Sequence, residues 1–197
     1  MDDLLPKSMY WILISERSDD NQFYLDGTPP LISTNEWSFE EGSAVTGIIP
    51  EIEMLYTIEP NEIMTDNLVS PGFRGLLIRN KVKGLLEILG LDNIQYFKTK
   101  LINEKTKEST EDYYIANIIG TYDCVDYDKS DLTFWDDGDI EFVESFVFKD
   151  ISDQEPPEIF RLSSFLPLVI ITDRVKKALD KQDYSGFKYY RPEEYYS

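Results

Sequence analysis

The densest group of side chains that could do chemistry lies in the stretch DCVDYDKSDLTFWDDGDIE, residues 123–141. Its carboxylates are Asp123, Asp126, Asp128, Asp131, Asp136, Asp137, Asp139 and Glu141. Carboxylates can bind a hard cation or serve as the acid and base of a hydrolase. Their spacing does not follow the EF-hand pattern of oxygen ligands with Gly at about position 6 and Glu at about position 12. Three interpretations stay open: a solvated rim, a surface that binds a partner, or an irregular site for a cation or for catalysis.

Composition excludes several other kinds of catalytic site. The chain has no histidine, so a Ser-His-Asp triad, a Cys-His pair and histidine–metal sites cannot form. The single cysteine, Cys124, stands among carboxylates that would raise its pKa, so we expect a structural thiol. The glycines of GFRGLLIRNKVKG, residues 72–84, match neither phosphate-binding glycine motif. We therefore predict no catalytic residue, no metal, no cofactor and no enzymatic activity.

Two aromatic residues stand beside the densest carboxylates. Phe134 and Trp135 directly precede Asp136 and Asp137, which is the composition of an interface hot spot. A tryptophan buried beside a hairpin turn is the more common arrangement for such a sequence. The predicted partner-binding residues are the carboxylates of residues 123–141 together with Phe134 and Trp135.

The charge of the chain is concentrated in two blocks. With 38 acidic and 19 basic residues the formal net charge is -19. Residues 1–66 hold 14 acidic and 2 basic side chains, and residues 111–158 hold 15 and 2, whereas residues 67–110 and 159–197 are mildly basic. Such acidity disfavours binding to a phosphate backbone and favours fast association with a cationic partner.

The start of the chain and its cysteine content indicate the compartment. MDDLLPKSMYWILISERSDD, residues 1–20, lacks the positive start and apolar run of a secretory signal. No apolar run approaches the ~18 residues of a membrane helix. A single cysteine permits no internal disulfide and agrees with a reducing compartment. We expect a cytoplasmic protein without a membrane partner.

One strand–helix–strand pattern occurs twice, in LVIITDRVKKALDKQDYSGFKYY (168–190) and in GLLIRNKVKGLLEILGLDNIQYF (75–97). Helix caps are expected at Thr172-Asp173 and at Asn80. Apolar residues at helical spacing predict the buried helix faces, while the lysines between them are expected to face solvent. The apolar residues are Val82, Leu85 and Leu86 in one unit, and Val175, Ala178 and Leu179 in the other.

Further strands are predicted at 9–14, 113–119 and 140–148, the last with Ile140, Phe142 and Phe146 on one face. Asp-Gly in DDGD, residues 136–139, predicts a tight hairpin turn. Together these patterns predict an α+β fold with mixed or antiparallel sheets and few helices. We expect a single globular domain over 1–197, made of two related halves at about 1–110 and 111–197.

Several of these stretches resemble a known family. They are YYIANIIGTYDCVDYDKS (113–130), EIFRL (158–162), ITDRVKKALDKQDYSGFKYY (171–190) and SPGFRGLLIRNKVKGLLEILGLDNIQYFKTKLI (70–102). The chain resembles the eleventh numbered family of bacterial polymorphic-toxin immunity proteins, formerly a domain of unknown function. The resemblance covers roughly residues 70–190. Its motifs are patterns of hydrophobic, aspartate and glycine positions without a catalytic signature.

The resemblance implies an antitoxin that binds a cognate, contact-delivered or secreted toxin and neutralises it by occlusion. Many toxin domains of this kind are basic nucleases, so the acidic surface is expected to face the toxin and not nucleic acid. Two alternatives stay open. One is an acidic DNA mimic that blocks a DNA-handling protein. The other, from a different class, is a carboxylate-dependent hydrolase with two convergent acids in a cleft.

Overall fold

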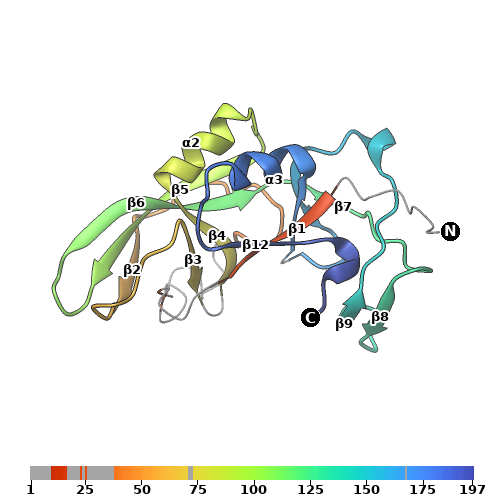
Figure 1. Cartoon of the computed structure of the whole chain (residues 1–197), viewed down its shortest axis with the longest axis horizontal. Helices are drawn as coiled ribbons and strands as arrows, with labels where there is room; N and C mark the ends of the chain where they lie inside the picture. Colours follow the sequence, from red (N-terminus) through yellow and green to blue (C-terminus); the bar gives the residue numbers. More distant parts are fainter. Residues whose placement is uncertain (1–9, 17–22, 24, 26–37, 71–72, 167) are drawn as a thin grey trace.

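The structure is a computed structural model that describes residues 10–16, 23, 25, 38–70, 73–166 and 168–197 (Figure 1). The described residues form two five-stranded sheets, one two-stranded hairpin and two α-helices. Both helices lie on the same side of the sheets (Figure 1). The predicted α+β class, with mixed sheets and few helices, is confirmed.

The first sheet is built around one copy of the repeated pattern. Its strands, in spatial order, are β2 (Ile52–Tyr56), β5 (Ile94–Asn103), β6 (Ser109–Ile118), β4 (Phe73–Arg79) and β3 (Asn67–Ser70). Helix α2 (Asn80–Ile88) joins β4 to β5, and both strands pair antiparallel with β6 between them. We call β3, β4, α2, β5 and β6 the first unit.

The second sheet repeats this topology. Its strands, in spatial order, are β12 (Phe187–Tyr190), β1 (Tyr10–Ser15), β11 (Val169–Thr172), β10 (Ile159–Leu162) and β7 (Thr121–Tyr122). Helix α3 (Asp173–Asp180) joins β11 to β12, and both strands pair antiparallel with β1 between them. We call β10, β11, α3, β12 and β1 the second unit.

The two units obtain their middle strands differently. β6 directly follows β5, so residues 67–118 hold the first unit, whereas β1, which precedes the first unit in sequence, completes the second. The registers agree: Ile115 of β6 pairs with Leu77, and Ile12 of β1 pairs with Ile170. The second sheet therefore depends on a strand that is distant in sequence from its other strands.

Lysines at equivalent positions of the two helices contact aromatic rings of the sheets. Lys83 on α2 lies with its Nζ 5.1 Å from the ring centroid of Tyr96 and forms an i,i+4 ion pair with Glu87 at 2.7 Å. Lys176 on α3 lies 4.5 Å from the Trp11 ring and pairs with Asp180, again at i,i+4. Cation–π contact and the apolar stem of lysine favour this packing. The expectation that the helix lysines face solvent holds for Lys81 and Lys177, which are exposed, whereas Lys83 and Lys176 are only partly exposed.

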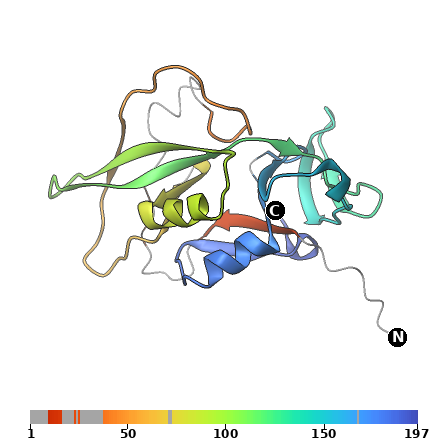
Figure 2. The ribbon, with the colours of Figure 1, turned by 90° about the horizontal axis from the view of Figure 1, so that it is seen from above.

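A shared hydrophobic core lies between the helices and both sheets. It is filled by equivalent residues of the two units, and Figure 2 shows the helices side by side above it. The pairs are Leu13 and Ala116, Leu76 and Val169, Ile78 and Ile171, Val82 and Val175, and Leu86 and Leu179. The predicted buried faces of both helices are thus confirmed at Val82, Leu86, Val175 and Leu179.

Each sheet carries a separate core on its outer face, and parts of the acidic blocks cover these cores. Phe23, Leu25 and Phe39 pack in the core of the first sheet, whereas Ile140, Val143 and other residues of the 123–158 segment cover the second. The alternation of charge along the sequence therefore follows the architecture. The mildly basic segments contain most of the two units, and the acidic blocks contain their covers.

The helix starts differ from the prediction. Asn80 is the first residue of α2 and Arg79 is its N-cap, without a side-chain capping bond. Thr172 is the N-cap of α3 as expected, but its hydroxyl donates to Glu158 Oε1 at 3.3 Å in place of capping the helix. Each helix begins at the residue that follows its strand. The end of the strand therefore sets where the first helical turn begins, without a side-chain cap.

Candidate partner-binding site

The predicted tight turn joins the strands of a hairpin formed by β8 (Asp131–Phe134) and β9 (Ile140–Ser145). Trp135 N–H donates to Asp139 O, and Gly138 N–H donates to Trp135 O, both at 2.9 Å. Gly138 has a φ of 93°, which a side-chain-bearing residue rarely adopts. The Asp-Gly signal is therefore confirmed as the turn of this hairpin.

One side of the hairpin holds it to the body. Ile140 and Val143 are buried in the core outside the second sheet, together with Phe146. The last residues of the chain lie along β9: Ser197 N–H donates to Val143 O at 3.0 Å, and Phe146 N–H donates to Pro192 O at 3.1 Å. These contacts fix the hairpin at the end of the molecule opposite the β5–β6 turn (Figure 1).

Several aromatic residues in and beside the hairpin are partly exposed to solvent. Trp135 is 57% exposed, Phe134 45% and Phe142 40%, and Tyr127 is 46% exposed. The rings of Tyr127 and Phe134 lie 6.5 Å apart between centroids. The common arrangement of a buried tryptophan is therefore not found. Exposed aromatic rings are typical of binding surfaces.

The strand prediction for 140–148 needs two corrections. β9 ends at Ser145, and Phe142 does not share a buried face with Ile140 and Phe146. The pairing of β8 and β9 shifts register between Thr133 and Phe134, so strict alternation is lost. This shift places Phe142 on the exposed side.

Among the described residues, most of the predicted carboxylates form no ion pair. Asp126 and Asp123 are the exceptions. Lys129 holds Asp126 at 2.6 Å and lowers the pKa of its carboxyl group, and Asp123 pairs with Lys149 at 3.1 Å. No ion pair within the described part of the chain reaches the exposed carboxylates of Asp128, Asp131, Asp136, Asp137, Asp139 and Glu141. Within the part of the chain that the structure describes, these carboxylates therefore carry negative charge without ion-paired cations beside exposed rings.

We call the exposed residues of this region together the hairpin face. It consists of Tyr127, Phe134, Trp135 and Phe142 with the carboxylates of Asp128, Asp131, Asp136, Asp137 and Asp139. Sequence reasoning missed Tyr127 and Phe142, although their position among carboxylates was a signal of the same kind as that of Trp135. Within the described residues, no group of three or more Asp, Glu or Cys side chains is arranged to hold a metal ion.

Cys124 lies beneath the hairpin face and is fully buried. Burial, aided by the negative charge of Asp123, raises the pKa of its thiol to about 12. The structure thus confirms a structural thiol of low reactivity.

A thiol-labelling experiment tests this placement. Under native conditions at pH 8 we expect Cys124 to react with a chromogenic disulfide at least ~100-fold more slowly than in the urea-unfolded chain, because the thiolate is scarce and covered. The unfolded chain is the internal control. Rapid labelling of the folded protein would contradict the buried position.

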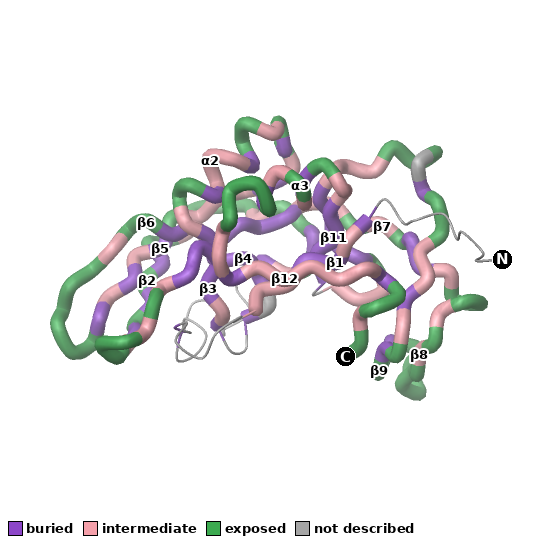
Figure 3. The backbone as a smooth tube through the Cα atoms, viewed as in Figure 1, coloured by how far each residue is buried: buried purple, intermediate pink, exposed green. Residues whose placement is uncertain are grey.

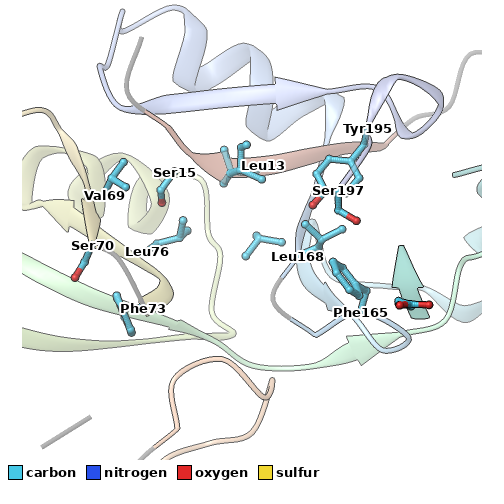
Figure 4. Close-up of a pocket in the computed structure, with 13 residues that line it drawn as sticks. Leu13, Ser15, Val69, Ser70, Phe73, Leu76, Phe165, Leu168, Tyr195 and Ser197 are labelled. Atoms are coloured by element: carbon cyan, nitrogen blue, oxygen red, sulfur yellow. The ribbon is translucent and has the colours of Figure 1, made fainter. Parts of the chain in front are cut away.

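One pocket, with a volume of about 390 Å³, borders the hairpin (Figure 4). Among its described lining residues, Glu141 is the one carboxylate side chain, whereas a two-carboxylate hydrolase needs a pair of acids in one cleft. A second pocket, of about 280 Å³, contains Glu51 and Glu111, but Lys98 pairs with Glu111 at 2.6 Å and lowers the pKa of its carboxyl group. Neither arrangement adds support to the hydrolase alternative.

Comparison with known proteins gives one finding. A family model described as "Immunity protein family (Imm11)" matches residues 20–194. No curated protein matches the chain. In the part of the chain that the structure describes, neither helix has the length and apolar character needed to cross a membrane.

Proposed function

The chain belongs to the Imm11 immunity protein family, and from this premise we propose that it neutralises a cognate toxin by binding it. In this proposal the hairpin face docks onto the toxin and occludes its active surface. The partner is a basic protein domain, for which a nuclease is the best fit in charge. The protein acts in the cytoplasm, without catalysis of its own and without binding nucleic acid or membrane.

The observation that carries the proposal is the exposure of four aromatic rings within an unpaired acidic surround. Tryptophan and tyrosine at the centre of an interface contribute much of the binding free energy, because they bury a large area with few rotatable bonds. The surrounding carboxylates would steer a cationic partner during encounter and accelerate its association. A hairpin held firmly at its base costs little conformational entropy on binding.

Co-expression tests the proposal. The polypeptide encoded by the adjacent gene should stop growth when expressed alone, and this chain should restore growth and copurify with it. A variant with both Trp135 and Phe134 replaced by alanine should fold but fail to protect. If the neighbouring product is not toxic, or if it is toxic and does not bind, the proposal is wrong.

A competition experiment on the same complex distinguishes the DNA-mimic alternative from the proposal. Duplex DNA should compete with this chain for the toxin only where the hairpin face covers a DNA-binding surface. Competition by DNA for a partner that has no toxicity would favour the DNA mimic.

A further inference from the structure

The last residues of the chain connect the second sheet to the hairpin. We call Arg191–Ser197 the strap. It follows β12 directly, contains the short 3-10 helix Pro192–Glu194 and runs beside β9, as the end of the chain in Figure 1 shows. The strap therefore joins two parts of the fold that are far apart in sequence.

Strand β9 lies between β8 and the strap. Val143 pairs with Leu132 of β8 on one edge of β9. On the other edge, Ser197 N–H donates to Val143 O at 3.0 Å, and Val143 N–H donates to Ser197 Oγ at 3.2 Å. Just beyond β9, Phe146 N–H donates to Pro192 O at 3.1 Å. The strap thus occupies the edge of β9 that faces away from β8.

These hydrogen bonds link the backbone of the hairpin to the rest of the fold. β8 and β9 form a two-stranded sheet of their own and pair with neither five-stranded sheet. Within the described residues, Ser197 is the one residue outside 131–145 to which a backbone group of either strand is hydrogen-bonded. A two-stranded hairpin alone is marginally stable in water. The strap and the core beneath Ile140 and Val143 therefore hold it in place.

Tyr195 is at the centre of the packing of the strap. Its ring stacks on Phe146, with centroids 6.0 Å apart and an interplanar angle of 16°, and it meets the Tyr190 ring of β12 edge-on at 5.8 Å. Aromatic pairs in such geometries contribute more than the area they bury. Tyr195 is half-buried, whereas its neighbour Tyr196 is 71% exposed. One ring therefore bridges the second sheet and the residue that follows β9.

The start of the strap is fixed to the second sheet. Cζ of Arg191 lies 3.6 Å from the ring centroid of Trp11 on β1, which is a cation–π contact, and Pro192 is buried. Arg191 N–H donates to Glu194 Oε2 at 3.3 Å and closes the turn. The strap is thus attached to the sheet before it reaches the hairpin, so it holds β9 in a set position relative to β1.

We infer that the strap positions the hairpin face for the toxin, with Tyr195 as its positioning residue. The inference rests on the proposed function and names an element of this chain on which that function depends. A hairpin that is fixed before encounter loses little conformational entropy when the toxin binds, whereas a hairpin that must be ordered during binding loses more. Weakening the strap should therefore lower the affinity, although Tyr195 is not part of the hairpin face.

Hydrogen exchange in the free protein tests the structural half of the inference. Tyr195→Ala should raise the exchange rates of the Val143 and Phe146 amides by at least ~10-fold, because their acceptors lie on the strap. The amides of β11 should keep their protection. Tyr195→Phe retains the ring and should behave as wild type. Tyr196→Ala is the matched control on the same strap, and it should leave both exchange rates within about 3-fold of wild type.

Calorimetry with the toxin encoded beside this chain tests the binding half. Tyr195→Ala should weaken binding by about 10-fold or more, and Tyr195→Phe should restore it. Ser197→Ala covers the case in which Tyr195→Ala does not fold, because Ser197 is exposed and its replacement leaves the core intact. This variant removes the Oγ that accepts from Val143 N–H, so it should speed exchange at that amide and weaken binding by about 3-fold or more.

The outcomes separate this inference from the proposed function. If Tyr195→Ala loosens β9 and still binds the toxin as tightly as wild type, the strap inference is wrong and the proposed function stands. The same holds if the Val143 amide exchanges no faster in either variant. Equal losses in Tyr195→Ala and Tyr195→Phe would overturn the role given to the stacked ring. If the wild type does not bind the toxin, both the inference and the proposed function are wrong.

Discussion

Replacing Trp135 and Phe134 together by alanine is expected to weaken toxin binding by at least ~100-fold while leaving the fold intact. Both rings are about half exposed in the free protein, so their removal costs little core packing. Truncation of a central aromatic anchor costs about 2 kcal/mol or more in binding, and two neighbouring anchors together exceed that. Calorimetry of the complex and the thermal midpoint of the free variant measure the two effects separately.

The matched control for this pair is Ile88→Ala. Ile88 is 84% exposed and apolar, but it lies on α2, remote from the hairpin face. Its replacement should leave the affinity within about 3-fold of wild type, as is usual for surface positions outside an interface. Equal losses in both variants, or full binding by the aromatic variant, would contradict the assignment of the hairpin face.

The acidic surround of these rings explains why their exposure is tolerated. An exposed aromatic cluster invites self-association, whereas a surface of one charge sign keeps identical molecules apart. The same charge attracts a cationic partner. Figure 3 shows that the exposed tip of the hairpin stands apart from the buried strands of the two sheets. The chain thus separates a mildly basic frame, formed by the two units, from the acidic hairpin that we propose to meet the partner.

The local elements of the frame followed from the sequence because their signals are local. Strand β6, the hairpin turn at Gly138 and the buried faces of both helices depend on residues a few positions apart. The family was also recognisable, since its stretches span both units. The resemblance of the two strand–helix–strand patterns correctly indicated equivalent geometry.

The partners of the middle strands could not be predicted in the same way. YWIL at the start of β1 and YYIA within β6 have nearly the same pattern, so alternation suits either strand to either sheet. The choice between the sheets depends on contacts more than 90 residues apart, such as Ile12 with Ile170. A pattern of apolar residues determines which face of a strand is buried, but it does not determine which strand lies beside it.

The exposure of Trp135 was unpredictable for a related reason. Burial of a hairpin residue depends on which side of the hairpin faces the body, and a register shift between β8 and β9 decides this. The sequence carried no signal of the shift. The pocket could not be predicted from the sequence either, because its walls come from segments that are far apart in the chain. These include β1, β3, β4, the β10–β11 connection and the hairpin.

The last prediction concerns the middle strands of the two sheets. Ile12→Ala and Ile115→Ala should each destabilise the whole chain by about 2–5 kcal/mol, because both side chains are completely buried and leave cavities. Since the two units share one core, we propose that the two sheets unfold as one cooperative unit. Loss of either strand's packing should therefore lower the stability of both sheets.

Urea unfolding, followed by tryptophan fluorescence and by hydrogen exchange of amides in both sheets, measures the effect. Leu55→Ala is the control, since Leu55 lies on β2 of the first sheet and is 58% exposed, so its replacement should cost less than about 1 kcal/mol. Wild type and both isoleucine variants should show one transition, with the amides of β4 and β11 losing protection together. Two separate transitions, with one sheet still protected after the other has opened, would mean that the two sheets are independent and that the shared core does not couple them.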